Sequence, residues 1–315
     1  MTHSGTSASR QDLAIRTKQL TKNYGSFQAL HGLDLSVKTG EVHGFLGPNG
    51  AGKSTTIRIL LGILRKTAGE AQLLGGDPWD DAVELHKRVA YVPGDVNLWP
   101  NLTGGEVIDF FCRLSGEPDK QRLAQLLERF ELDPTKKCRT YSKGNRQKVA
   151  IVAALASEVE LFILDEPTSG LDPLMETVFQ DCIKELKAAG KTVLLSSHIL
   201  AEAEALCDRL TIIREGKAVE SGSLEELRHL TRMNMSVEVA KPLKDLGKVR
   251  GVHNPQIKGT HAEFEVENEA ISDVLHYLSQ YEVKHFVSTP PSLEKLFMRH
   301  YGDKLSTIDR EEENL

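Results

Sequence analysis

The eight residues from Gly47 to Ser54 read GPNGAGKS and fit the phosphate-binding pattern GxxxxGK[ST]. Glycines in such a loop let successive backbone N–H groups point inward at phosphate oxygens, and the helix that follows presents its positive end to the same anion. Lys53 then reaches the β- and γ-phosphates, and the Ser54 hydroxyl is a ligand for Mg²⁺. A glycine-rich turn without a ligand is the weaker reading. We therefore predict nucleotide binding by Gly47, Pro48, Asn49, Gly50, Ala51, Gly52, Lys53, Ser54 and Thr55.

A second candidate group follows the apolar run Leu161–Leu164, which ends in the carboxylates of Asp165 and Glu166. Asp165 can hold the Mg²⁺ shell by accepting hydrogen bonds from its water ligands, and Glu166 can polarise the attacking water. Two adjacent acids can also simply begin a polar loop, but beside a phosphate-binding loop they favour a P-loop nucleoside triphosphatase. These two motifs are equally compatible with a small-molecule kinase. A GTPase is disfavoured because no NKxD-like guanine-reading motif lies in a suitable place.

The elements that must position these residues alternate between strand and helix from Leu13 onward. Short apolar runs such as LFIL and TVLL are typical of strands covered on both faces, so the pattern predicts an α/β domain with a largely parallel sheet. Strands are expected at Ala14–Leu20, Leu33–Val37, Glu41–Leu46, Val89–Val92, Leu161–Leu164, Thr192–Ser196 and Arg209–Arg214. Helices are expected at Lys53–Leu64, Thr103–Leu114, Gln121–Phe130, Gly144–Ala156, Met175–Ala188 and Leu224–Leu230.

The pattern changes near Met233, where a β-α-β-β-α-β order plus one helix predicts a small α+β, split-βαβ domain. Its elements are expected at 236–240, Leu243–Leu246, Val252–Ile257, Ala262–Val266, Ala270–Tyr281, Val283–Val287 and Leu293–His300. The predicted organisation is a flexible tail over 1–12, a nucleotide-binding domain over 13–230, an accessory domain over 233–302 and an acidic tail over 303–315.

Composition excludes several classes of protein. The net charge is −6 over 315 residues, which disfavours non-specific nucleic-acid binding because that binding depends on Lys and Arg neutralising phosphates. The longest uncharged runs, Asn23–Leu33 and Val42–Gly52, are 11 residues each, whereas a membrane-spanning helix needs about 20 apolar residues. The N-terminus has no apolar core and is not expected to be a secretory signal. Four widely spaced cysteines predict buried, reduced thiols.

Three further motifs make the nucleotide site resemble one family. The segment Tyr141–Lys148, YSKGNRQK, resembles the LSGGQ signature of ATP-binding-cassette (ABC) proteins, Ser169–Asp172 resembles their D-loop, and His198 resembles their switch histidine. All lie in the family's order and spacing, over roughly Leu13–Leu230. The resemblance implies a P-loop ABC ATPase domain with a RecA-like core and a helical subdomain, and it disfavours the kinase.

The resemblance also implies roles for residues outside the phosphate loop. Two ATPase domains dock head to tail in this family, so that Ser142 and Gly144 of one contact the γ-phosphate bound by the other. His198 would hold the γ-phosphate and the attacking water, Glu166 would be the base, and Asp172 would line the interface. For catalysis, the resemblance implies Glu166, His198 and Lys53. For nucleotide binding, it adds Tyr24 (stacked on adenine), Ser142 and Gly144 to the phosphate loop. For Mg²⁺, the implied residues are Ser54 and Asp165.

The sequence departs from the family pattern in two places. The signature reads YSKGN, although Ser142 and Gly144 are retained. Where the family has a Q-loop glutamine after Pro93, this chain has Gly94, followed by Asp95. Either Asp95 substitutes from one position later or a water fills the gap. We still predict a competent ATPase. The next stretch, Val96–Leu102, is apolar for a loop; either it receives a membrane subunit, as in the family, or Trp99 packs under the helical subdomain.

The segment Pro291–Phe297, PSLEKLF, resembles the C-terminal ending of ATPase subunits in drug- and antibiotic-type ABC exporters. The resemblance implies the ATP-hydrolysing subunit of an exporter, with ATP and Mg²⁺ as cofactors. A separate transmembrane permease and a second ATPase subunit, expected to be an identical copy, would be its partners. Such a subunit would be cytoplasmic and peripheral on the inner face of the membrane. The alternative is a soluble ABC ATPase of the translation or DNA-repair type, which is disfavoured because the chain has one nucleotide domain and no room for a long coiled coil between Lys53 and Ser142.

Overall fold

The computed structural model describes residues 13–116, 119–229 and 232–289. The chain divides into two compact units, Met1–Ser221 and Gly222–Leu315. The expected N-terminal tail, the helix Leu293–His300, the PSLEKLF segment and the acidic tail lie outside the described residues.

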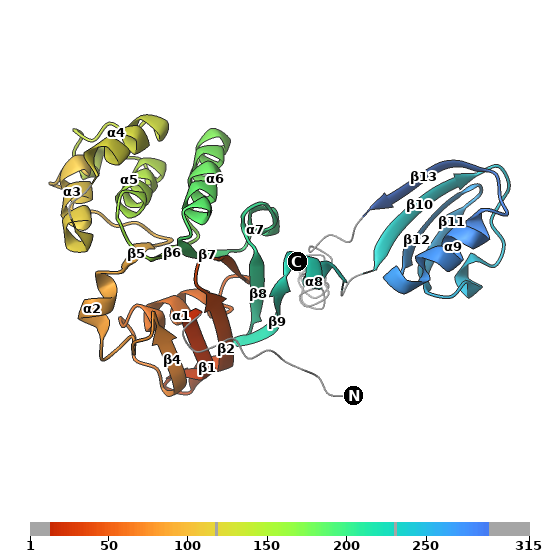
Figure 1. The fold of residues 1–315 in the computed structure, drawn as a ribbon, viewed down its shortest axis with the longest axis horizontal. Coiled ribbons are helices and arrows are strands. Elements are labelled where there is room, and N and C mark those ends of the chain that lie inside the picture. Colours follow the sequence, from red (N-terminus) through yellow and green to blue (C-terminus); the bar gives the residue numbers. More distant parts are fainter. Residues whose placement is uncertain (1–12, 117–118, 230–231, 290–315) are drawn as a thin grey trace, which may run out of the picture. The chain divides into compact units, whose positions relative to one another are not determined.

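The centre of the first unit is a six-stranded sheet in the order β5-β6-β7-β3-β8-β9 (Figure 1). The pairs β5–β6, β6–β7, β7–β3 and β3–β8 are parallel, so their carboxyl ends meet at one edge. Both β3 and β6 are buried along their whole length, as expected for strands covered on two faces. The strands are β3 (Val42–Leu46), β5 (Val89–Val92), β6 (Leu161–Asp165), β7 (Thr192–Ser197), β8 (Arg209–Arg214) and β9 (Lys217–Ser223).

A separate antiparallel sheet in the order β2-β1-β4 packs on one side of this centre. Its strands are β1 (Leu13–Tyr24), β2 (Phe27–Lys38) and β4 (Ala68–Leu73). In β2 the buried residues Leu33, Leu35 and Val37 alternate with exposed ones, which is typical of a sheet with a single covered face.

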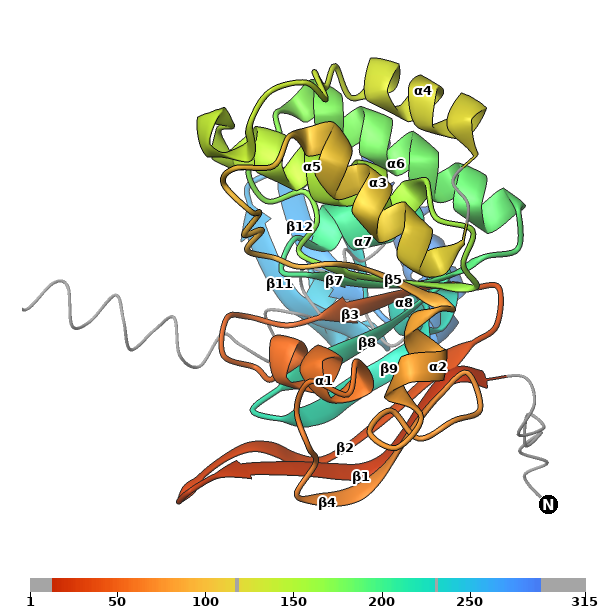
Figure 2. The same cartoon turned by 90° about the vertical axis from the view of Figure 1, so that its left-hand side faces the viewer.

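Helices cover both faces of the parallel sheet. Helix α1 lies on the face toward the antiparallel sheet, and α5 and α6 lie on the opposite face (Figures 1 and 2). Several helices begin at residues that cap them: Thr103 forms a capping box with Glu106, and Asp119, Ser142 and Asp172 each accept a backbone N–H. The helices are α1 (Lys53–Leu60), α2 (Ala82–His86), α3 (Gly104–Ser115), α4 (Lys120–Arg129), the 3₁₀ turn η1 (Cys138–Thr140), α5 (Lys143–Leu155), α6 (Pro173–Ala188) and α7 (Leu200–Leu206).

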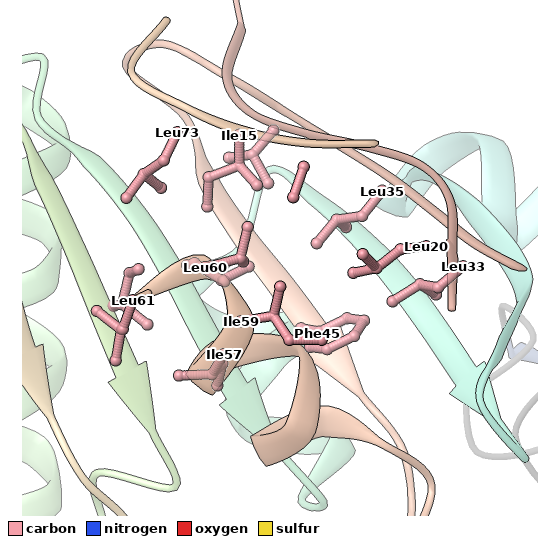
Figure 3. Close-up of a cluster of buried hydrophobic side chains, with 14 of the residues drawn as sticks. Ile15, Leu20, Leu33, Leu35, Phe45, Ile57, Ile59, Leu60, Leu61 and Leu73 are labelled. Carbon is pink, nitrogen blue, oxygen red and sulfur yellow. The ribbon is translucent and has the colours of Figure 1, made fainter. Parts of the chain in front are cut away.

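A core of aliphatic side chains joins α1 to the two sheets and so fixes the start of the helix. Figure 3 shows Ile57 and Leu60 of α1 beside Phe45 of β3, all fully buried. The antiparallel sheet covers them with buried Ile15, Leu20, Leu33, Leu35 and Leu73. Burial of side chains of this size contributes about 1.5–3 kcal/mol each, so the position of α1 is strongly determined.

The second unit begins with α8 (Leu224–His229) and contains a four-stranded antiparallel sheet in the order β11-β12-β10-β13. Buried Met235, Val237 and Val239 alternate along β10 and belong to one core with Val274 and Leu278 of α9. The other elements are β10 (Met233–Val239), η2 (Leu246–Lys248), β11 (Val252–Lys258), β12 (His261–Val266), η3 (Asn268–Ala270), α9 (Ile271–Leu278) and β13 (Val283–Thr289).

The α/β fold class predicted from the sequence is confirmed, with local corrections. The strands expected at Ala14–Leu20 and Leu33–Val37 are present, but they belong to a separate antiparallel sheet that the sequence did not predict. The helix expected at Lys53–Leu64 ends at Leu60, because the chain turns at Gly62 with φ +63°. In place of the helix expected at Leu243–Leu246 there is the 3₁₀ turn η2. The sequence did not predict β4, β9, α2 or α7.

Candidate active site

The phosphate-binding loop connects β3 to α1 and is shaped by glycines. A Cβ atom at Gly47 would lie 2.5 Å from the carbonyl oxygen of Ile213, which no side chain tolerates. Gly52 has φ +110°, a conformation that favours glycine, and it directly precedes the first turn of α1. Because they have no side chains, Gly47 can lie against Ile213 of β8, and Gly52 can adopt the backbone turn that leads into α1.

Lys53 is the first residue of α1, and its ammonium group is turned back into the loop. Nζ donates to the carbonyl oxygens of Gly47 (2.6 Å) and Pro48 (3.3 Å), and the side chain is only 5% exposed. The next two residues are Ser54, which is exposed, and Thr55, which is half-buried. The loop thus gathers one buried cation and one accessible hydroxyl, the groups expected to meet a triphosphate and its metal.

Asp165 and Glu166 lie at the carboxyl end of β6. Asp165 is buried and accepts a hydrogen bond from the Ser196 hydroxyl of neighbouring β7. Burial raises the pKa of Tyr91 on β5 to about 12, and the negative charge of Asp165 contributes to this rise. Glu166 has φ +48°, and its backbone N–H donates to the carbonyl of Ser196 at 3.0 Å. A non-glycine residue in this conformation is strained, and such strain is concentrated at functional sites.

Glu166 lies between Lys53 and His198. Its Oε1 lies 3.2 Å from Nζ of Lys53, and its Oε2 lies 3.5 Å from Nδ1 of His198. The three residues follow β3, β6 and β7, which are adjacent parallel strands, so their carboxyl ends bring the side chains to one edge. The structure therefore brings the predicted Lys53, Glu166 and His198 together, with His198 half-exposed and Glu166 mostly covered.

The signature residues lie at the start of α5, with contacts of their own. The Ser142 hydroxyl accepts the N–H of Asn145 (3.2 Å) and is exposed. A Cβ atom at Gly144 would lie 2.6 Å from the carbonyl of Gly170 in the D-loop, so the two segments are in close contact. Among the described residues, the hydrogen bonds of Ser142 stay within α5 and do not extend to the phosphate loop. Asp172 caps α6 by accepting the N–H of Met175 at 3.0 Å.

Tyr24 and Gly94 are the remaining predicted positions. Tyr24 ends β1 and is exposed, with Nζ of Lys22 5.1 Å from its ring centroid, so it is not a core tyrosine. A Cβ atom at Gly94 would lie 3.1 Å from the carbonyl oxygen of Asp165, which places this position against the end of β6. Asp95 is exposed, and its carboxylate accepts a hydrogen bond from Asn97 at 3.4 Å. A substitute role for Asp95 therefore stays a prediction.

A surface patch forms where the apolar loop after Gly94 meets α3. We call it the aromatic patch, and it consists of Trp99 of the loop and Phe110 and Phe111 of α3. The Trp99 ring lies 5.6 Å from Phe110 and 6.1 Å from Phe111, and all three side chains are at least 41% exposed. An apolar cavity of about 300 Å³ adjoins it, lined in part by Leu98 and Phe111. Trp99 therefore packs against α3 while about half of its side chain stays exposed to solvent. The two phenylalanines were not predicted from the sequence, although adjacent aromatics on an expected helix were a visible signal.

Glu202 on α7 was also missed. Its side chain is 7% exposed; Oε2 accepts from the Ser197 hydroxyl at 2.6 Å, and Oε1 has no hydrogen-bond partner among the described residues. Burial raises the pKa of the Glu202 carboxyl above its ordinary value, and the hydroxyls of Ser197 and Thr168 only partly offset this. Its sequence surroundings, LAEAEAL, resemble a solvated helix face and gave no signal.

Membrane-spanning character is absent from the described helices. Over residues 13–116, 119–229 and 232–289, no helix has the length and apolar character needed to cross a bilayer. All four cysteines are buried and free, as expected.

Comparison with known proteins gives matches along the chain. A family model described as "ABC transporter" matches residues 30–169, and one described as "ATP-binding protein DrrA1-3-like, C-terminal domain" matches residues 222–301. An uncharacterized ABC transporter ATP-binding protein, YhaQ, of Bacillus subtilis (strain 168) is 32% identical over 90% of this chain and 97% of its own length. The daunorubicin resistance ATP-binding protein DrrA3 of Streptomyces coeruleorubidus is 34% identical over 93% and 97%.

A solved structure adds a likeness in three dimensions. It is described as the dimeric, post-hydrolysis state of the ATP-binding cassette MJ0796 bound to ADP and Pi. It matches with a TM-score of 0.61 and 28% identity, over 67% of this chain and 98% of that one.

Proposed function

The chain belongs to the ATP-binding proteins of ABC transporters, and from this membership we propose that it is the ATP-hydrolysing subunit of an exporter. The observation that carries the proposal is the contact of Glu166 with both Lys53 and His198. Daunorubicin resistance, named for a relative matched along both units, supports export over the translation or repair alternative. We assign ATP hydrolysis to residues 13–230 and an accessory role to residues 233–302.

The loop Gly47–Thr55 would hold the triphosphate of ATP, and exposed Tyr24 offers a face on which adenine can stack. The buried cation of Lys53 would neutralise the β- and γ-phosphates. The donor set also fits Mg²⁺, which takes oxygen ligands and keeps several waters: Ser54 supplies an accessible hydroxyl and Asp165 a carboxylate. When bound, Mg²⁺ neutralises charge on the β- and γ-phosphates.

Glu166 and His198 would perform the hydrolysis. The Glu166 carboxylate accepts a proton from water while the water oxygen attacks the γ-phosphorus and the bond to the ADP oxygen breaks. His198 donates a hydrogen bond toward the γ-phosphate, and Lys53 balances its negative charge. These groups come from three adjacent strands, which hold them at one edge of the sheet.

A second copy of the chain would complete the site. Ser142 and Gly144 start α5, whose N-terminal end favours an anion, and the exposed Ser142 hydroxyl has its hydrogen bond within α5 and not with its own phosphate loop. We therefore propose that they cover the γ-phosphate held by another ATPase subunit, with Asp172 at the interface. The dimeric form of the similar cassette supports this arrangement.

The membrane partner would dock at the aromatic patch. Three half-exposed aromatic rings beside an apolar cavity form the kind of surface that marks protein–protein contacts. A transmembrane permease carried by a separate polypeptide would occupy it and hold this subunit on the inner face of the membrane.

Two measurements test the proposal. Purified full-length chain with ATP and Mg²⁺ should release phosphate, and Glu166→Gln should abolish release while nucleotide binding persists. Equal rates for the two proteins would overturn the ATPase assignment. For the exporter reading, the chain should sediment with the membrane fraction of its host cells; recovery with ribosomes instead would favour the translation-type alternative.

A further inference from the structure

The carboxylate of Glu202 is buried with only half of its hydrogen-bonding capacity used. Its side chain is 7% exposed, and Oε1 has no hydrogen-bond partner within the described part of the chain. Leaving a buried acceptor unpaired costs about 1–3 kcal/mol, more when the group is charged. A neutral, apolar side chain at this position of α7 would avoid that cost, so the stability of the fold gives no account of the acid.

The hydrogen bond from Ser197 to Glu202 fixes the turn that carries His198. The Ser197 hydroxyl donates to Oε2 of Glu202 at 2.6 Å, and the oxygen of the same hydroxyl accepts the backbone N–H of Ile199 at 2.9 Å. The residues on either side of His198 are therefore both tied to this network. The backbone carbonyl of Ser197 also accepts the N–H of Gly47 in the phosphate loop, at 3.4 Å.

His198, which follows Ser197 in this turn, lies close to Glu166. Its Nδ1 is 3.5 Å from Oε2 of Glu166. The backbone N–H of Glu166 donates to the carbonyl of Ser196 at 3.0 Å, so the segment of Glu166 is itself tied to the strand that carries Ser197.

We propose that Glu202 is a positioning residue that sets the separation of His198 and Glu166 through its hydrogen bond with Ser197. The inference rests on the proposed ATPase function and adds a residue that acts through the Ser197 hydroxyl. A displacement of about 1 Å at a reacting group can lower a rate by about a hundredfold, so a buried tether of this kind has a measurable effect.

The test compares Glu202→Ala, Glu202→Gln and Ser197→Ala in the full-length chain. Steady-state ATP hydrolysis gives kcat and KM, a fluorescent ATP analogue gives Kd, and thermal unfolding reports the fold. Glu202→Ala should lower kcat by about tenfold or more, with KM and Kd changed less than about twofold. Glu202→Gln should recover most of the rate, because its amide oxygen still accepts the Ser197 O–H. Glu204→Ala, a less buried acid on the same helix, is the matched control.

A double variant separates positioning from independent damage. If Ser197 and Glu202 act as one unit, Ser197→Ala combined with Glu202→Ala should be no slower than the slower single variant. The inference is overturned if Glu202→Ala keeps wild-type kcat, if Glu202→Gln is as slow as Glu202→Ala, or if kcat, nucleotide affinity and unfolding temperature fall together. Absence of hydrolysis in the wild type, or an equal rate in Glu166→Gln, would instead be a failure of the proposed function.

Discussion

Nζ of Lys53 lies 3.2 Å from Oε1 of Glu166, so the cation of the phosphate loop and the acid after β6 form an ion pair inside the site. The same ammonium group donates to the carbonyls of Gly47 and Pro48, so its three close acceptors belong to the loop and to the acid. Phosphate oxygens of ATP would compete with these acceptors. The arrangement links nucleotide binding to the freeing of the Glu166 carboxylate for its work as a base.

Lys53→Ala is expected to weaken ATP binding. Hydrogen bonds to charged groups contribute about 1.5–3 kcal/mol, which corresponds to a loss of affinity of about tenfold to a hundredfold. Titration with a fluorescent ATP analogue measures it. Lys184→Ala, which removes an exposed lysine paired with Asp181 on α6, is the control and should bind normally. Unchanged affinity in Lys53→Ala would contradict the assignment of the loop.

Ser142→Asp is expected to block the ATP-dependent dimer without loss of stability. Aspartate caps helices as well as serine does, so α5 should keep its start, while the added charge repels the γ-phosphate of the partner. Light scattering after size exclusion, with ATP and in the Glu166→Gln background, measures the dimer. Ser272→Asp on α9 adds the same charge at an exposed position elsewhere. If Ser142→Asp still forms the ATP-dependent dimer, the signature segment is not part of the dimer interface.

Prediction from sequence succeeded where a local pattern has one physical cause. The phosphate loop needs glycines, a lysine and a following helix in fixed order, and β6 needs a short apolar run before its acids; both are local. The close approach of Lys53, Glu166 and His198 followed from family resemblance, because strand order cannot be derived from the strands alone. The division of the strands into a parallel and an antiparallel sheet was not predicted, for the same reason.

Other features depend on tertiary packing that leaves little trace in the sequence. The short α2 and α7 have five and seven residues, too few for a clear helical period. Glu202 is buried and hydrogen-bonded to Ser197, and nothing in LAEAEAL distinguishes it from Glu204. The aromatic patch exists because the loop of Trp99 folds onto α3, a contact between two segments whose sequences do not by themselves indicate it.

Trp99→Ala is expected to release the subunit from its membrane partner while basal hydrolysis persists. Loss of the aromatic contacts costs about 0.5–1.5 kcal/mol per pair, which should lower the unfolding temperature only slightly. Recovery of the chain in the membrane fraction and phosphate release by the purified protein are the two readouts. Trp79→Ala removes the other tryptophan, whose ring lies 5.6 Å from the Arg65 guanidinium, and should stay membrane-bound. Normal membrane recovery of Trp99→Ala would rule out the patch as the docking surface.

Glu185→Gln is expected to destabilise the contact between α4 and α6 at neutral pH but not in acid. Burial disfavours ionisation of Glu185, but hydrogen bonds from Arg122 and Arg129 outweigh it and hold the pKa of this carboxyl below its ordinary value of 4.5. A carboxylate with a lowered pKa stabilises the fold above 4.5, and that contribution disappears as the pH falls through 4.5 and then through the lower value of the folded state.

Because all three side chains are partly exposed, the expected loss at pH 7 is about 1 kcal/mol or less. Unfolding in urea at pH 7 and at lower pH measures how the deficit of Glu185→Gln changes, and it should shrink toward zero in acid. Asp181→Asn breaks the exposed pair with Lys184 on the same helix and should cost only about 0.3 kcal/mol. A deficit of equal size at both pH values would show that the charge of Glu185 does not account for its contribution, since protonation removes that charge in the wild type.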